Sequence, residues 1–253
     1  MTVIDVKQVT KTYGDLVAVD DVSFAVGRGE IVGFVGPNGA GKSTVLKMLS
    51  TFALPTAGTL TVDGLDVVEQ ALEVRRRIGY LPGDTPLYHE MRVGDFLAFV
   101  ARARGLRGGD LTAGLDRVVD LCDVGEVTHR RIGQCSTGFR QRLGLAAALV
   151  HDPPVLLLDE PTHGFDPLQV MAFRDLLTEL KSERAILFST HIIQDVEAIS
   201  DRVLIIHQGR LLGDGPVASL ATAAGAPGAG LEDTFARLVR TRTQPRGTGG
   251  PDA

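Results

Sequence analysis

Cysteine is scarce in this chain, and long apolar runs and an excess of positive charge are missing. The two cysteines, Cys122 and Cys135, lack metal-ligand spacing and form no disulfide framework, which suits a reducing compartment. No apolar stretch approaches the roughly 20 residues that cross a bilayer. The net charge of −5 argues against a chain that binds polyanions over its whole surface. We therefore expect no nucleic-acid partner, and membrane contact only through another protein.

The length and the start of the chain set further limits. Its 253 residues suffice for one large domain, alone or with a small appendage. Hydrophobic residues make up 44% and charged residues 23%, which is typical of a globular protein. The first residues, Met1 to Asp5, lack the basic start and apolar run of a secretory signal, so we expect no such leader.

The most informative stretch is a glycine-rich loop that fits the pattern G-x-x-x-x-G-K-[ST] without a mismatch. Residues 31–35 before it read as a short buried strand, and residues 45–49 after it read as the first turns of a helix. In that context glycines let backbone N–H groups point at an anion, and the helix N-terminus adds partial positive charge. The candidate phosphate-binding residues are Gly36, Pro37, Asn38, Gly39, Ala40, Gly41, Lys42, Ser43 and Thr44.

Three side chains of this loop suit a nucleoside triphosphate with Mg²⁺. Lys42 can reach the β- and γ-phosphates, the Ser43 hydroxyl can bind Mg²⁺, and Thr44 is placed for a further phosphate contact. Upstream, Tyr13 lies in a predicted turn region. An exposed tyrosine in a turn means little by itself, but before a phosphate loop it becomes a candidate platform for stacking a base.

The rest of the chain alternates between strand and helix patterns. Residues 93–150 show helical spacing, with a polar, glycine-rich connection expected from Gly105 to Gly114. Ser136 or Thr137 can cap the helix that follows. Strand character then returns in two apolar runs, which fit parallel strands buried on both faces. The first run ends in Asp159 and Glu160 and the second leads to His191.

Together these motifs resemble a nucleotide-binding subunit of an ATP-binding-cassette (ABC) transporter, over about residues 2–216. The matching pieces, in the family's order, are Tyr13, the loop at 36–44, the signature segment 136–140, the Walker B strand 155–160, the D-loop 164–167 and the switch histidine His191. The signature departs from the commonest LSGGQ form but keeps Ser136 and Gly138. The residues after it, and a short helix expected near the end of the chain, resemble cassettes paired with ABC-2-type permeases, which are often drug or antibiotic exporters.

The resemblance implies an α/β fold with a P-loop, RecA-like core, an antiparallel β-subdomain and an inserted helical subdomain at about residues 84–150. The cassette would span residues 1–216. Residues 217–253 would form a short extension with one helix at about 231–240. The Ala- and Gly-rich segment from Ala218 to Gly230 is expected to be flexible, and the polar tail from Thr241 disordered.

The resemblance also implies roles for the candidate site residues. Asp159 would hold Mg²⁺ with Ser43, and Lys42 would help to neutralise the transferred phosphoryl group. Glu160 is the candidate general base that polarises the attacking water. His191 would hydrogen-bond the γ-phosphate and help to position Glu160. The plainer alternatives are a surface acid at a strand end for Glu160 and a structural histidine for His191.

The implied partners are a second cassette and a membrane permease. Two chains would pack head to tail, so that Ser136 and Gly138 of one close on the ATP held by the other, and Asp166 would link the two sites. The permease would place the chain in the cytoplasm, on the inner face of the cell membrane. One alternative is a soluble, non-transport ABC ATPase. Another is a degraded cassette with little turnover, which the intact Lys42 and Glu160 argue against.

One departure from the family pattern affects the metal site. The family usually has a glutamine just after the strand at residues 78–82, where this chain has Gly83 and then Asp84. Glycine has no side chain to contact Mg²⁺ or to orient water. We hypothesise that Asp84 partly substitutes for the glutamine. The alternative is a loop acid with no role.

Overall fold

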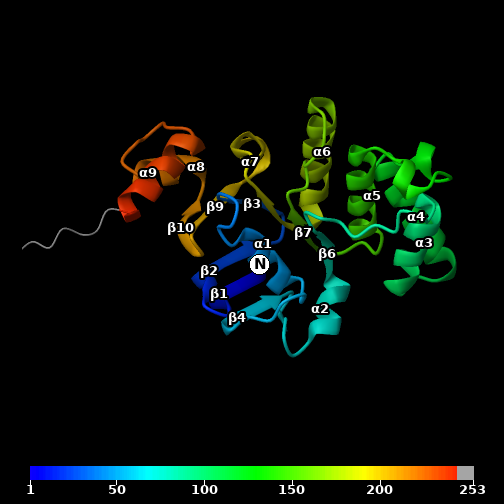
Figure 1. The fold of residues 1–253 in the computed structure, drawn as a ribbon, viewed down its shortest axis with the longest axis horizontal. Helices are drawn as coiled ribbons and strands as arrows, with labels where there is room; N and C mark the ends of the chain where they lie inside the picture. The colour runs from blue at the N-terminus through cyan, green and yellow to red at the C-terminus, as the bar shows by residue number, and fades with distance from the viewer. Residues whose placement is uncertain (244–253) are drawn as a thin grey trace, which may run out of the picture.

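The computed structural model describes residues 1–243 as two β-sheets with helices around them (Figure 1). The first sheet is antiparallel, with strand order β2-β1-β4-β5. A turn at Gly14, where φ is 57°, joins its two long strands, and glycine adopts this left-handed conformation without a steric penalty. The strands of this sheet are β1 Thr2–Tyr13, β2 Leu16–Gly27, β4 Ala57–Val62 and β5 Leu65–Asp66.

The second sheet is central and has strand order β10-β9-β3-β8-β7-β6. All its neighbouring strands pair in parallel except β10, which is antiparallel to β9. Because parallel strands end at the same edge of a sheet, the segments after β3, β7 and β8 meet there. The strands of this sheet are β3 Glu30–Val35, β6 Ile78–Leu81, β7 Val155–Asp159, β8 Ala185–Thr190, β9 Arg202–His207 and β10 Arg210–Gly215.

Apolar side chains pack on both faces of the central sheet. Along β3, Ile31 and Val35 belong to the cluster that includes the helices α3 to α7, whereas Val32 and Phe34 belong to the cluster with α1 and the antiparallel sheet. All four side chains are at most 2% exposed. This burial on both faces explains why the parallel strands consist of continuous apolar runs, as the sequence predicted.

The helices cover the central sheet and extend from it at both ends. Figure 1 shows α3, α4 and α5 gathered at one end of the molecule and α8 and α9 at the other. This arrangement confirms the predicted class, an α/β P-loop core with an antiparallel β-subdomain and inserted helices. Within residues 1–243 no helix is both long and apolar enough to cross a membrane. The helices are α1 Lys42–Leu49, α2 Ala71–Arg77, α3 Val93–Ala103, α4 Gly108–Leu121, α5 Thr137–Leu149, α6 Pro167–Leu180, α7 Ile193–Ile199, α8 Val217–Ala223 and α9 Leu231–Thr243.

The prediction of a glycine-rich connection from Gly105 to Gly114 is wrong, because α4 already begins at Gly108. A Cβ atom on Gly114 would lie 2.9 Å from the Val150 carbonyl oxygen, so glycine allows α4 to pack closely against the end of α5. Val118 of α4 is fully buried in the same helical cluster. Tertiary packing thus outweighs the low helix propensity of glycine.

The C-terminal extension carries two helices in the described residues, whereas the sequence predicted one. Helix α8 forms inside the Ala- and Gly-rich segment that was expected to be flexible. Alanine is the strongest helix former, and Leu220 and Ala221 are buried where α8 packs on β10 and α9. The tail predicted to be disordered from Thr241 lies, beyond residue 243, outside the described residues.

A partly buried histidine makes the stability of this fold dependent on pH. His151 has Nε2 3.0 Å from the Ile78 carbonyl oxygen, and its Nδ1 is buried without a partner among the described residues. Burial, followed by the charge of Arg104, lowers the pKa of His151 from 6.5 to about 4. The folded state therefore keeps this ring neutral while the unfolded chain takes up a proton, so stability is lost as the pH falls below 6.5.

We expect His151 alone to lower the free energy of unfolding by about 2 kcal/mol between pH 7 and pH 5. Urea unfolding at both pH values measures this change. The variant His151→Gln keeps a donor for the Ile78 carbonyl but cannot titrate. Its free energy of unfolding should therefore fall by about 2 kcal/mol less than that of the wild type between pH 7 and pH 5. Equal losses in the two proteins would refute the assignment.

Candidate nucleotide-binding site

The glycine loop between β3 and α1 has the shape that the sequence predicts for a phosphate site. Gly41 is the N-cap of α1 with φ 109°, a conformation that favours glycine. At Gly36 a Cβ atom would lie 2.3 Å from the Ile206 carbonyl oxygen, so no larger residue fits. Pro37, Asn38 and Gly39 between them are exposed. The loop thus presents backbone N–H groups and a helix N-terminus to an anion.

Lys42 lies inside this loop, and its side chain is only 5% exposed. Its Nζ donates to the carbonyl oxygens of Gly36 at 2.7 Å and Pro37 at 3.2 Å, and it lies 3.8 Å from Glu160 Oε1. Burial lowers the pKa of Lys42, while the charges of Glu160 and Asp159 act in the opposite direction. The loop therefore holds a desolvated ammonium group next to Asp159, the last residue of β7, and Glu160, which follows it.

Ser43 and Asp159 form the pair that could hold a metal ion. The Ser43 hydroxyl donates to Asp159 Oδ1 at 2.9 Å, and the Ser189 hydroxyl donates to the same oxygen. Hydroxyl and carboxylate oxygens are the ligands that Mg²⁺ prefers. Across residues 1–243 no group of three His, Cys, Asp or Glu side chains forms a metal site. The donor set fits Mg²⁺ bound by few protein ligands and completed by phosphates and water.

Contacts to both the backbone and the side chain of Glu160 fix its position. Its backbone N–H donates to the Ser189 carbonyl at 3.0 Å, and its Oε2 lies 2.8 Å from His191 Nδ1. Its φ of 49° is left-handed, which costs a residue other than glycine about 1–3 kcal/mol. Local strain of this kind persists only where the surroundings fix the backbone, as the strand end and His191 do here.

Gln141 supports the same segment and was missed in the sequence. It lies in α5, is 8% exposed, and donates through Nε2 to the Pro161 carbonyl at 3.1 Å and the Glu160 carbonyl at 3.5 Å. The available signal was its spacing: Leu145 and Ala148, four and seven residues later, are buried, so Gln141 occupies a core position of the helix. A polar residue at such a position needs a hydrogen-bond partner.

A cavity of about 970 Å³ opens beside these residues. Its wall includes Ser43, Asp159, Glu160 and His191, so the structure brings together these predicted residues from the ends of β7 and β8 and the start of α1. Asp84 also lines the cavity and is exposed. The cavity is therefore wide enough to receive a phosphate chain in front of the paired acids.

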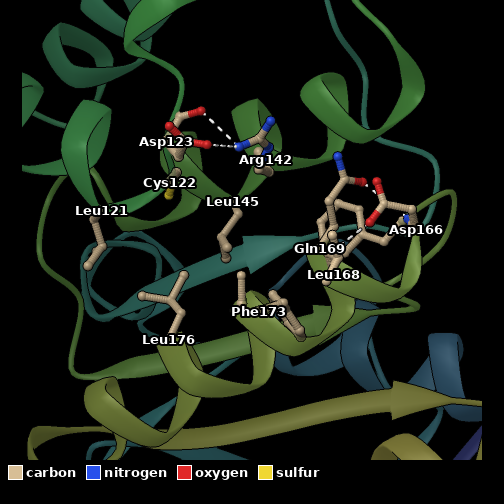
Figure 2. Close-up of a pocket in the computed structure, with 12 residues that line it drawn as sticks. Leu121, Cys122, Asp123, Arg142, Leu145, Asp166, Leu168, Gln169, Phe173 and Leu176 are labelled. Carbon is tan, nitrogen blue, oxygen red and sulfur yellow. Dashed lines mark hydrogen bonds and ion pairs between the residues drawn. The ribbon is translucent and has the colours of Figure 1, made fainter.

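The predicted signature and D-loop residues lie apart from this cluster. Ser136 caps α5 by accepting from the Phe139 N–H at 3.3 Å. Asp166 caps α6 by accepting from the Gln169 N–H at 2.9 Å, and a Cβ on Gly138 would lie 2.6 Å from Gln169 Oε1. Figure 2 shows Asp166 and Gln169 at the rim of a separate crevice of about 260 Å³ between α5 and α6. Within one chain these residues pack on each other and do not line the cavity beside Asp159.

Tyr13 stands at the end of β1, and its ring is about half exposed. The Lys11 ammonium group lies 4.7 Å from the ring centroid, in a cation–π contact. The ring is thus accessible for stacking, although the structure places a lysine against it. No hydrogen bond or ion pair within the described residues joins Tyr13 to the acids or to Lys42.

A parallel sheet that ends in a glycine loop, a buried lysine and a Ser–Asp pair defines a P-loop nucleotide-binding protein. Comparison with known proteins agrees, because the ABC transporter family matches residues 19–163. The ABC transporter ATP-binding protein NatA of Bacillus subtilis (strain 168) is 41% identical over 205 residues, which are 80% of this chain and 83% of NatA. The bacitracin transport ATP-binding protein BcrA of Bacillus licheniformis is 36% identical over 217 residues, covering 85% of this chain and 70% of BcrA.

Solved structures give the same result. The ATP-binding subunit of an ABC transporter superimposes with a TM-score of 0.87 at 29% identity, over 94% of this chain and 99% of that one. The ATP-binding cassette MJ0796, bound to ADP and Pi, superimposes with a TM-score of 0.78 at 24% identity, over 84% of this chain and 98% of that one. This second likeness shows the fold alone. The chain belongs to the ABC transporter family. It is the ATP-binding subunit of such a transporter and an ATPase, and the soluble, non-transport alternative gains no support.

Proposed function

We propose that this chain hydrolyses Mg²⁺-ATP with Glu160 as the general base. The observation that supports this assignment best is the series of contacts Lys42–Glu160–His191, with distances of 3.8 and 2.8 Å, beside the Ser43–Asp159 pair. Lys42 binds the β- and γ-phosphates, and His191 orients the Glu160 carboxylate toward the attacking water. Ser43 and Asp159 would hold Mg²⁺, which would supply positive charge for the phosphates.

Two chains act as a head-to-tail pair in this proposal. The N-terminus of α5, with Ser136 and Gly138, lies away from the phosphate loop of its own chain and is free to approach the ATP of a second copy. Asp166 lies next to it and links the two sites. The solved structure of the cassette MJ0796 with ADP and Pi is described as dimeric, which fits this arrangement.

In this proposal the chain supplies energy for the export of a substrate through a separate membrane permease. Relatives include the bacitracin transport protein above and the Nod factor export ATP-binding protein I of Rhizobium etli, which is 36% identical over 216 residues, covering 85% of this chain and 68% of the relative. The permease would hold the chain on the cytoplasmic face of the membrane. Residues 1–216 form the cassette in this proposal, with the helical subdomain at about 84–150 and the extension at 217–253.

An exposed aromatic patch offers the permease a place to bind. The aromatic patch consists of Phe52, Tyr88 and Phe99, which are 80%, 58% and 49% exposed. Tyr88 packs against Phe99 with ring centroids 6.1 Å apart, and all three line the mouth of the 970 Å³ cavity. Grouped aromatic side chains on a surface mark protein interaction sites. Contact at this position would connect the permease directly to the nucleotide cavity.

Changing Phe52 and Phe99 together to serine should lower co-purification with the permease at least about tenfold, since aromatic anchors at interfaces contribute about 1–2 kcal/mol or more each. The tagged chain is purified from native membranes in detergent, and the co-eluting polytopic protein is identified and quantified. Leu168→Ala removes an equally exposed apolar side chain from α6 and should leave co-purification intact. Wild-type recovery with the double variant would contradict the proposed contact.

A further inference from the structure

Tyr80 carries a buried hydroxyl group that has no hydrogen-bond partner in the part of the chain that the structure describes. It lies on β6, where it pairs in register with Leu157 of β7. Because side chains alternate along a strand, Tyr80, Leu157 and Asp159 all project from the face of the sheet that carries α1. An unpaired buried hydroxyl costs about 1–3 kcal/mol, so its position requires an explanation.

The surroundings of this hydroxyl point to the metal site. Tyr80 lines the same cavity as Ser43 and Asp159. Burial, together with the negative charge of Asp159, raises the pKa of Tyr80, so the phenol remains a hydrogen-bond donor at neutral pH. Both hydroxyl donors to Asp159, from Ser43 and Ser189, reach Oδ1.

Gly83 leaves this part of the cavity without the glutamine side chain that the family pattern has just after the strand. A Cβ atom there would lie 3.5 Å from the Asp159 carbonyl oxygen and 3.7 Å from Asp159 Oδ2. These distances are ordinary contacts, so a side chain at position 83 would fit and would face the carboxylate of Asp159. The chain thus lacks a polar group here, two residues beyond the strand that carries the unpaired Tyr80 hydroxyl.

We infer that Tyr80 is a positioning residue for the divalent cation: its hydroxyl donates to a water that the cation holds beside Asp159, a contact that Gly83 cannot supply. This inference rests on the proposed Mg²⁺ site. It explains why a tyrosine hydroxyl is buried without a protein partner at this position. It also gives the metal site a polar contact that does not depend on Asp84, an exposed residue of the cavity wall.

The variant Tyr80→Phe removes only the hydroxyl and tests this role. Titration of Mn²⁺ into the full chain with a non-hydrolysable ATP analogue, followed by electron paramagnetic resonance, should show about fivefold weaker metal binding, the size of one hydrogen bond. Metal-free nucleotide affinity should stay the same. The melting temperature should not fall, because the lost hydroxyl had no protein partner. Adding Gly83→Gln to Tyr80→Phe should restore metal affinity.

Thr85→Val is the matched control, since it removes a hydroxyl from the same cavity wall that already donates to the Pro82 carbonyl. It should leave metal affinity unchanged. Equal metal affinity in wild type and Tyr80→Phe would overturn the role of Tyr80 while leaving the proposed function intact. A wild-type chain whose nucleotide complex binds no Mn²⁺ would overturn both. A lower melting temperature with unchanged metal affinity would assign Tyr80 a purely structural role.

Discussion

Glu160→Gln should bind ATP normally and hydrolyse it about 10² to 10⁴ times more slowly than the wild type, the range that a general base contributes. The amide has nearly the shape of the carboxylate, so it keeps the backbone bond to Ser189 and the neighbourhood of His191. It cannot accept a proton from the attacking water. Steady-state phosphate release, measured with the permease present, gives the rate, and calorimetric titration gives the ATP affinity.

The same variant should accumulate a closed dimer, because ATP that is not hydrolysed continues to bind the associated state. Light scattering with ATP should show twice the monomer mass, and the mass should fall when ADP replaces ATP. Glu179→Gln makes the same chemical change at an exposed position on α6 and should leave turnover and mass unchanged. Undiminished turnover in Glu160→Gln would rule out Glu160 as the base.

Lys42→Ala should weaken ATP binding about 100-fold and abolish measurable turnover, since charge-assisted hydrogen bonds to phosphates contribute about 1.5–3 kcal/mol. Lys42 is buried against the Gly36 carbonyl and close to Glu160, so its ammonium group is already desolvated and directed into the loop. The fold should survive, because burial lowers the pKa of Lys42 and its charge is costly in the protein alone. Calorimetric titration and thermal unfolding measure both effects.

Lys47→Ala is the control for this change. Lys47 lies one turn further along the same helix α1 and is exposed, although it lines the cavity mouth. Its loss should lower ATP affinity no more than about threefold, since exposed charges interact weakly in water. Comparable losses in the two variants would show that general positive charge, and not the buried Lys42, binds the nucleotide.

The nucleotide loop could be predicted from the sequence because the residues that define it are neighbours in the chain. Gly36, Gly41 and Lys42 lie in one short segment between a predicted strand and a predicted helix, and this pattern indicates a phosphate loop before distant contacts, such as that of Gly36 with the Ile206 carbonyl, are known. The same holds for Asp159 and Glu160, which follow directly from the end of a buried strand. The order of these pieces was enough to identify the family.

Other features depended on contacts between residues far apart in the chain. Gln141 and Tyr80 appeared ordinary in the sequence, since only packing shows that one supports the Glu160 backbone and the other has an unpaired hydroxyl. Helix α8 and the early start of α4 were also missed. Burial outweighs the low helix propensity of glycine at the start of α4, whereas in α8 the burial of Leu220 and Ala221 adds to the helix propensity of alanine.

By itself the sequence determined that this protein binds and hydrolyses ATP as an ABC transporter subunit, because residues adjacent in the chain make the phosphate loop. Only the tertiary structure decided how the site is assembled. The order of β3, β8 and β7 in the sheet brings Ser43 to Asp159 and His191 to Glu160, whereas Ser136 caps α5 and does not line the cavity beside Asp159. Strand order depends on which strands pair, and these pairs join residues far apart in the chain, such as Val32 with Leu187, so no single stretch of sequence contains that information.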